Sequence, residues 1–273
     1  MNKRILLVVI IVLIILAIFA ILKIKRPLVI VSGQGAKPVF TSAAGLYTKA
    51  KELEAKGNLY EAKLMYQKLV SEFSNSPEVV NWQRKIEDLN IRLLFSPVLI
   101  PKSILYEIKP GDALIKIAYE FKTTAELIQK SNGLKDDKII PGRKIKVWVA
   151  PFNIIVDKSQ NTLVLKSDEE IVKTYIVSTG ANNSTPVGKF KIVNKLPHPT
   201  WFKAGAVVAS DSPENILGTR WLGLNLPGYG IHGTTDPQSL GKQITQGCVR
   251  MSNSEVEELY DIVPVGAEVT IVD

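Results

Sequence analysis

The chain has 273 residues, of which 46% are hydrophobic, so it can form two or three small domains with packed cores. Its formal net charge is +8, but the basic residues are scattered without an arginine-rich tract, which argues against nucleic-acid binding. A single cysteine excludes an internal disulfide, and one cysteine with two histidines does not readily fill a four-ligand zinc site, so no metal site is predicted.

The first predicted element is an apolar N-terminal segment. Residues 5–22 are 18 consecutive apolar residues without a charge. As a helix they would span about 27 Å, close to the hydrocarbon thickness of a bilayer. The alternative is a cleaved signal peptide, which has a shorter apolar core and a cleavage site of small residues. The length of the run and the basic residues directly after it favour a transmembrane anchor.

A linker and a helical segment come next. Residues 23–41 contain two prolines and two glycines and are predicted to be a linker. Hydrophobic residues at helical spacing predict an α-helical hairpin spacer over residues 42–94. The stretch from Gly57 to Val70 is similar to the second half of a tetratricopeptide repeat, although about three such repeats are needed for stable stacking. Two interpretations stay open: a plain spacer, and a tetratricopeptide-like segment that binds a protein partner.

Residues 103–149 have the pattern of a compact unit. A short alternating strand is followed by a turn at Asp112, a helix, a second helix that begins after Thr124, and a final strand. Asp112 is expected to cap the first of these helices. This βααβ unit resembles a LysM domain over its whole length. The resemblance implies binding to glycans that contain N-acetylglucosamine, such as peptidoglycan, with weak attachment from a single copy.

Residues 152–273 contain short strands separated by turns rich in glycine and proline, which predicts a mainly-β domain, a β-sandwich or β-roll. Cys248 lies 16 residues after His232, and a glycine directly precedes it. A thiol, an imidazole and a neighbouring glycine are the components of a cysteine nucleophile. The alternative is a cysteine that is buried as a small hydrophobic residue.

The segments S-T-G, T-P-V-G-K-F-K-I, G-Y-G-I-H-G-T and G-C-V-R-M resemble, in this order, the L,D-transpeptidases of the YkuD type. In that family a stem peptide is cleaved after its third residue, the terminal D-alanine leaves, and the acyl group rests on the cysteine. An amine of a neighbouring stem then accepts it to form a 3→3 crosslink. The resemblance therefore implies a peptidoglycan L,D-transpeptidase that needs no cofactor and has stem peptides and glycan strands as its partners.

The same resemblance implies a location in the cell envelope. An enzyme that acts on the cell wall has its catalytic domain outside the cytoplasm, on the periplasmic or wall side. Together with the anchor predicted over residues 5–22, this gives a multidomain protein attached to the cytoplasmic membrane. Its predicted order is a transmembrane helix, a helical spacer, a LysM domain and the catalytic domain.

The resemblance assigns Cys248 as the nucleophile and His232 as its base, oriented by the backbone carbonyl of Gly233. A free thiol is mostly protonated near neutral pH, so an imidazole that takes its proton is required. Backbone amides of Gly247 and Cys248 are predicted to hold the oxyanion, and one such donor is worth about 3 kcal/mol. Arg250 is assigned to a carboxylate of the stem peptide or to loop architecture.

Three further residues are candidates for substrate binding. Thr245 keeps the hydroxyl of the family motif, in which Gln246 replaces a second histidine that some members have before the glycine. Trp221 and Tyr229 are candidates for the wall of a substrate groove, with core packing as the alternative. His198 lies between two prolines and is expected in a surface loop.

Two other functions stay open. Release of the acyl-thioester to water would give an L,D-carboxypeptidase that trims stems, and the choice of acceptor depends on the shape and dryness of the groove. An inactive C-terminal domain would leave a non-catalytic anchor that binds peptidoglycan. The intact pair of His232 and Cys248 argues against this last alternative.

Overall fold

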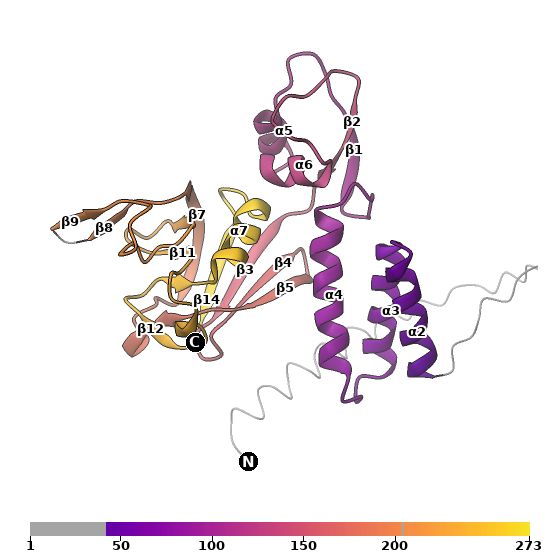
Figure 1. Ribbon diagram of the computed structural model, residues 1–273, viewed down its shortest axis with the longest axis horizontal. Helices are drawn as coiled ribbons and strands as arrows, with labels where there is room; N and C mark the ends of the chain where they lie inside the picture. Colours follow the sequence, from indigo (N-terminus) through magenta and orange to yellow (C-terminus); the bar gives the residue numbers. More distant parts are fainter. Residues whose placement is uncertain (1–41, 204) are drawn as a thin grey trace, which may run out of the picture. The chain divides into compact units, whose positions relative to one another are not determined.

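The computed structural model describes residues 42–203 and 205–273 (Figure 1). The predicted anchor over residues 5–22 and the linker over residues 23–41 lie outside the described residues. Within the described ranges, no helix is long and apolar enough to cross a membrane. The predicted fold class is corrected on this point, because the architecture that is described contains no transmembrane helix.

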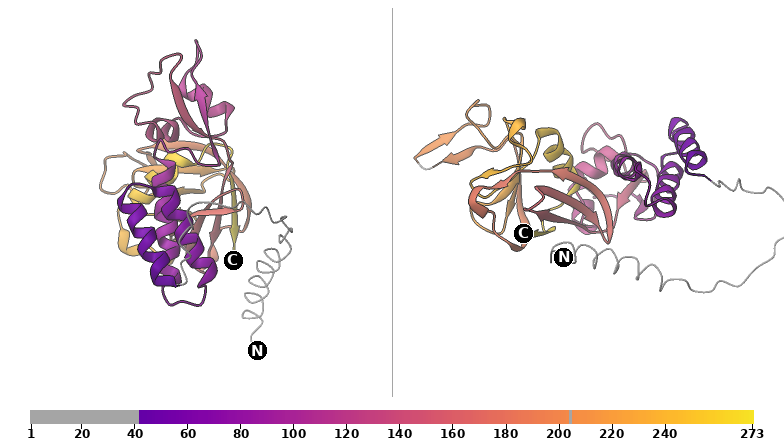
Figure 2. Two further views of the ribbon diagram at one scale, coloured as in Figure 1. Left: turned by 90° about the vertical axis from the view of Figure 1, so that its right-hand side faces the viewer. Right: turned by 90° about the horizontal axis from the view of Figure 1, so that it is seen from below.

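Three helices form the segment after residue 41, which the sequence predicts to be helical over residues 42–94. α2 (Ala43–Ala55), α3 (Leu59–Glu72) and α4 (Val79–Leu94) lie side by side (Figures 1 and 2). The third helix forms because buried residues recur at helical spacing along it: Trp82, Ile86, Leu89 and Leu93.

The next unit has the strand–helix–helix–strand order of the predicted LysM domain. Its elements are β1 (Ser103–Glu107), α5 (Leu114–Glu120), α6 (Ala125–Ser131) and β2 (Lys144–Trp148), and the two strands pair antiparallel. Thr124 caps α6 by accepting a hydrogen bond from a backbone amide of the first turn. Ile128 of α6 is buried in the unit's own core, whereas Leu127 packs in the core of the C-terminal unit and the Thr124 hydroxyl also donates to the Asp261 carbonyl.

Asp112 does not cap α5, contrary to the prediction. Its carboxylate accepts hydrogen bonds from the Lys109 backbone amide (2.8 Å) and the Tyr106 hydroxyl (2.9 Å). The residue at the N-cap position is Ala113, which has no side-chain acceptor. Asp112 thus stabilises the turn between β1 and α5 instead of the helix terminus.

The C-terminal unit is built around one mixed sheet of eight strands in the order β13-β11-β10-β7-β14-β3-β4-β5. Their bounds are β3 (Phe152–Asp157), β4 (Thr162–Ser167), β5 (Glu170–Ile176), β7 (Gly188–Pro197), β10 (Arg220–Leu224), β11 (Gly230–His232), β13 (Val249–Arg250) and β14 (Glu268–Val272). The long strand β7 pairs with β14 over residues 188–191 and with β10 over residues 192–197. It therefore joins the two halves of the sheet.

Smaller elements surround this sheet. β6 (Thr179–Gly180) pairs with β12 (Gln243–Thr245), and β8 (Trp201–Lys203) pairs with β9 (Ala206–Val208). The β8–β9 hairpin extends away from the large sheet (Figures 1 and 2). Helix α7 (Asn253–Ile262) buries its apolar residues in the same core as the strands. One core thus supports both the helix and the strands beside it.

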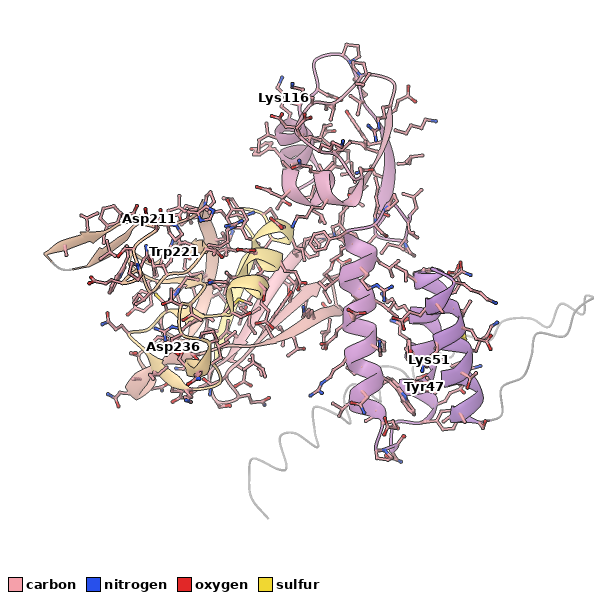
Figure 3. The ribbon with its side chains drawn as sticks, in the orientation of Figure 1. Tyr47, Lys51, Lys116, Asp211, Trp221 and Asp236 are labelled. Atoms are coloured by element: carbon pink, nitrogen blue, oxygen red, sulfur yellow. The ribbon has the colours of Figure 1, made fainter. Side chains whose placement is uncertain are left out.

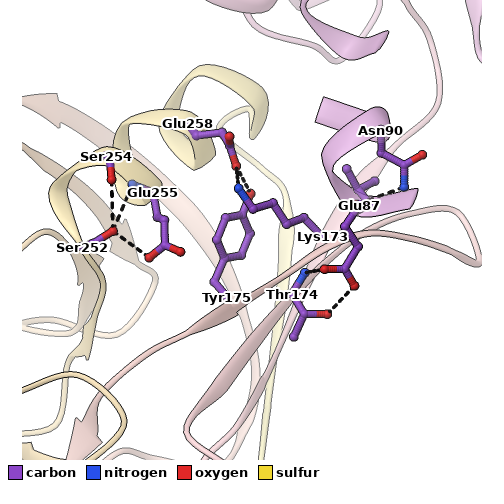
Figure 4. A network of polar contacts seen from close by, with 10 residues as sticks. Glu87, Asn90, Lys173, Thr174, Tyr175, Ser252, Ser254, Glu255 and Glu258 are labelled. Atoms are coloured by element: carbon purple, nitrogen blue, oxygen red, sulfur yellow. Dashed lines mark hydrogen bonds and ion pairs between the residues drawn. The ribbon is translucent and has the colours of Figure 1, made fainter. Parts of the chain in front are cut away.

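Helix α4 covers β5, the last strand of the large sheet. The Asn90 side-chain amide donates to the carbonyls of Ile171 (3.1 Å) and Val172 (3.0 Å), and Glu87 accepts from the backbone amide and hydroxyl of Thr174 (Figure 4). These contacts satisfy backbone groups that an edge strand would otherwise expose. Among the residues that the structure describes, nothing supports the predicted protein partner of the helical segment.

Candidate active site

The parallel pairing of β11 and β13 sets the positions of the predicted catalytic side chains. Ile231 pairs with Val249 and His232 with Arg250, and Cys248 directly precedes β13. Because side chains alternate between the two faces of a strand, Cys248, His232 and Arg250 point to the same face. All three line one cavity of about 650 Å³.

The side chains that were predicted to bind substrate line the same cavity. Thr245, Tyr229 and Trp221 line it, and Trp201 and Phe202 of β8 add to its wall. Phe202 is 77% exposed at the end of this wall. Cys248 is half-buried, so its sulfur sits in an open cavity that is large enough for part of a peptide.

His232 is held in one orientation. Its Nδ1 lies 2.6 Å from the carbonyl oxygen of Gly233. A carbonyl can only accept, so Nδ1 carries the proton of the neutral ring and Nε2 is the basic nitrogen. The ring of Trp221 (labelled in Figure 3) stacks on the imidazole, with 5.9 Å between centroids and 19° between planes. The carbonyl sets the tautomer and the indole holds the plane of the ring.

The electrostatic surroundings favour a neutral thiol beside a neutral imidazole. Burial lowers the pKa of His232 to about 4; the Gly233 carbonyl opposes this shift, the charge of Arg250 adds to it, and the Leu217 carbonyl opposes it. Burial also raises the pKa of Cys248, against the lowering effects of the Gly230 backbone amide and Arg250. A proton must therefore leave the sulfur during attack, because the resting pair is uncharged.

The turn before Cys248 is stabilised by Thr245. Its hydroxyl donates to the Cys248 carbonyl (2.7 Å) and accepts from the Gly247 amide (3.1 Å). Gly247 has φ +131°, and a Cβ there would lie 2.7 Å from the ring of Tyr229. Only glycine fits this position. An oxyanion would compete with Thr245 for the Gly247 amide.

Arg250 contacts both the surrounding loops and the cavity. One guanidinium nitrogen donates to Ser239 Oγ (3.0 Å), and its backbone pairs with Ser178 at 2.8 Å in both directions. Within the described part of the chain, its buried Nε has no hydrogen-bond partner. Arg250 can therefore serve both loop architecture and carboxylate binding. One guanidinium nitrogen bonds to Ser239, and other N–H groups of the guanidinium are left to bind a carboxylate.

Comparison with known families covers both C-terminal units. Residues 151–271 match the L,D-transpeptidase catalytic domain, and residues 106–148 match the LysM domain. YkuD of Bacillus licheniformis, which is named as an L,D-transpeptidase, is 37% identical over 176 residues that cover 62% of this chain and 98% of the relative. This chain belongs to the L,D-transpeptidase family.

YkuD of Bacillus subtilis is 35% identical with the same coverage. YqjB of Bacillus subtilis, also named as an L,D-transpeptidase, is 39% identical over 126 residues, which cover 44% of this chain and 70% of the relative.

The resemblance inferred from short segments is thereby confirmed. The chain combines a LysM domain with an L,D-transpeptidase catalytic domain, and this combination supports binding to peptidoglycan. Both domains fit a location in the cell wall or envelope. The predicted attachment to a membrane gains no support, because no helix of the described residues could span one.

Two residues of this L,D-transpeptidase site were missed by the sequence analysis. Gly230 packs against the indole of Trp221, and Asn253 hydrogen-bonds to the loop before β10 and to the loop after β11. The closely spaced glycines in G-Y-G-I-H-G were a signal for Gly230, since repeated glycines mark close backbone approach. No comparable signal pointed to Asn253, which follows an ordinary serine N-cap.

Gly230→Ala is expected to displace the Trp221 ring from His232. A Cβ on Gly230 would lie 2.6, 2.7 and 2.8 Å from three atoms of the indole, well inside van der Waals contact. A small displacement of a catalytic group lowers rates by up to about 100-fold, so we expect a drop of roughly 10- to 100-fold in the acylation rate. Mass spectrometry of the covalent adduct with a carbapenem measures this rate.

The double variant Gly230→Ala/Trp221→Phe, which has a smaller ring at position 221, serves as the control. Its acylation rate should recover part of the way toward the wild-type value if the clash with the indole is the cause. An unchanged rate in Gly230→Ala would show that the stack does not orient the imidazole.

Proposed function

We propose that this L,D-transpeptidase forms 3→3 crosslinks in peptidoglycan through an acyl-enzyme on Cys248. The observation that supports this most directly is the shared cavity, which is lined by the buried imidazole of β11 and by the half-buried thiol of the residue directly before its partner strand β13. Reaction at a thiol requires no cofactor.

In the first half-reaction, the Cys248 sulfur attacks the carbonyl carbon of the third residue of the donor stem. The Nε2 of His232 takes the thiol proton as the carbon–sulfur bond forms. The imidazolium is then stabilised by the carbonyls of Gly233 and Leu217, both of which favour the protonated ring. It returns the proton to the amine of the terminal D-alanine, and the carbon–nitrogen bond breaks.

We assign the tetrahedral oxyanion to the backbone amide of Cys248, with the Gly247 amide as a second donor that is shared with Thr245. In the second half-reaction an amine of a neighbouring stem attacks the thioester. His232 takes a proton from that amine and returns it to the sulfur, which leaves as the thiol. Attack by an amine restores an amide, and a 3→3 crosslink requires that this amine belong to the diamino acid of a neighbouring stem.

Arg250, Tyr229 and Trp221 are the proposed contacts to substrate. The guanidinium suits a carboxylate of the stem, and the two aromatic rings offer flat apolar surface in the cavity. Thr245 contributes through the turn that carries Cys248, since its hydroxyl bonds within that turn. We further propose that the LysM domain holds glycan strands and raises the local concentration of stems.

Incubation of the full-length protein with disaccharide-tetrapeptides tests the proposed reaction. The expected products, identified by mass spectrometry, are free D-alanine and 3→3 crosslinked dimers. Tripeptide monomers without dimers would instead establish an L,D-carboxypeptidase. Absence of D-alanine release, together with binding to purified sacculi, would establish a peptidoglycan-binding anchor.

A further inference from the structure

Asn253 is the first residue of helix α7 and connects two separate loops. Its Oδ1 accepts hydrogen bonds from the backbone amides of Thr219 and Thr234, both at 3.1 Å. Thr219 precedes β10, whereas Thr234 follows β11. A single side-chain oxygen thus holds the loops at the same end of two neighbouring strands.

The backbone approaches this oxygen very closely. A Cβ on either Gly218 or Gly233 would lie 2.2 Å from Asn253 Oδ1. A Cβ on Gly218 would also lie 2.6 Å from the amide nitrogen of Thr234. Both loops therefore need glycine beside Asn253, and each has little freedom to move while its amide stays bonded.

The bond to Thr234 bears directly on His232. The amide of Thr234 and the carbonyl of Gly233 belong to the same planar peptide unit. Holding the N–H of this unit determines the direction of its C=O, which accepts the bond from His232 Nδ1 at 2.6 Å. Asn253 thus sets the acceptor that selects the tautomer of the imidazole.

The hydrogen bond from the Thr219 amide to Asn253 restricts the backbone next to a second carbonyl that interacts with the imidazole. That carbonyl belongs to Leu217, one peptide unit before the amide of Thr219. The intervening Gly218 has φ +64°, a conformation that other residues rarely adopt. The same oxygen therefore stabilises the backbone that carries both of these carbonyls.

We propose that Asn253 is a positioning residue for the catalytic base, which fixes the tautomer and orientation of His232 through the 233–234 peptide unit. This inference rests on the proposed role of His232. It assigns a role in the reaction to a side chain that does not line the cavity, because the cavity walls do not include Asn253.

Two substitutions separate the acceptor from the shape of the side chain. Asn253→Leu keeps the branching of the side chain but has no acceptor, and its methyl groups are bulkier than the amide atoms that they replace, so the two backbone amides lose their partner. Asn253→Asp keeps an acceptor oxygen and suits the start of a helix, where negative charge is favourable. We expect Asn253→Leu to lower the acylation rate by roughly 10- to 100-fold, as loss of a supporting hydrogen bond often does, and Asn253→Asp to restore most of it.

Imidazole ¹⁵N spectroscopy of the full-length protein supplies a readout that a purely structural role would not change. The chain has two histidines, so His198→Gln assigns the signals of His232. The wild type is expected to show a proton on Nδ1 at neutral pH. Asn253→Leu is expected to show a mixture of tautomers, and Asn253→Asp the wild-type pattern.

A folded Asn253→Leu protein with the wild-type tautomer and acylation rate would overturn the proposal. If the leucine variant does not fold, Asn253→Ala removes the acceptor without adding bulk and is interpreted in the same way. A change of tautomer without a change of rate would also overturn it. Failure of the proposed function gives a different result, in which the wild type forms no adduct on Cys248 whatever the tautomer of His232.

Discussion

Cys248→Ala is expected to abolish both the carbapenem adduct and the release of D-alanine from a tetrapeptide. Carbapenems are strained cyclic amides that leave an acyl group on an attacking nucleophile. Removal of a covalent nucleophile typically lowers turnover by about 10⁴-fold or more, because the remaining groups only bind and polarise the substrate. Intact-protein mass spectrometry detects the adduct, and amino-acid analysis detects the D-alanine.

Cys248→Ser tests whether a hydroxyl can replace the thiol at this site. A serine hydroxyl is harder to deprotonate than a thiol, and burial makes His232 a weak base, with its pKa lowered to about 4. We therefore expect the serine variant to be nearly as inactive as the alanine variant. Because Cys248 is the single cysteine of the chain, an adduct that persists in Cys248→Ala would show that another group is the nucleophile.

The second large effect concerns the base and the pH dependence of acylation. His232→Gln is expected to lower the acylation rate by about 10²- to 10⁴-fold, the usual contribution of general-base catalysis. An imidazole accepts a proton only when it is neutral, and burial lowers the pKa of His232 to about 4. The wild-type rate should therefore stay nearly constant from pH 8 down to pH 5 and fall only near pH 4. Stopped-flow or mass-spectrometric acylation rates over this range check the expectation.

A thiolate that attacks without its base would behave differently. Because the pKa of Cys248 is raised by burial, its thiolate fraction would increase about tenfold per pH unit across the neutral range. A rate that rises in this way between pH 5 and pH 8 would contradict the role of His232. The variant His198→Gln, which changes the exposed histidine outside the cavity, should keep the wild-type profile.

The same pKa shift predicts acid destabilisation of the fold. An unfolded histidine has a pKa of about 6.5, above the folded value, so the unfolded chain takes up a proton between pH 6.5 and pH 4 that the folded protein does not. Stability is therefore lost as the pH falls through this window, on the order of 3 kcal/mol by pH 4. Unfolding followed by circular dichroism at each pH measures the loss of stability. The acylation rate of protein that is still folded measures the loss of the neutral base.

Local sequence patterns were sufficient to predict the L,D-transpeptidase family and the LysM unit, whereas the roles of Cys248 and His232 stay predictions. Cys248 and His232 stand in short segments whose glycines and hydrophobic residues carry the family resemblance, and the family matches cover both units. Thr124 was expected to begin a helix and does cap one, because capping depends on neighbouring residues. The segment over residues 5–22 was predicted from hydropathy alone and lies outside the described residues.

Contacts between distant residues were decided only by the tertiary structure. Asn90 bonds to Val172 across 82 positions, Asn253 to Thr219 across 34, and Trp221 stacks on His232 from a neighbouring strand. Asn90 and Asn253 are polar residues within helices, where composition alone indicates a solvated face. Their roles arise from the directions of peptide units in other strands and loops. A local pattern does not encode these directions, because they follow from how the whole sheet pairs and packs against α4 and α7.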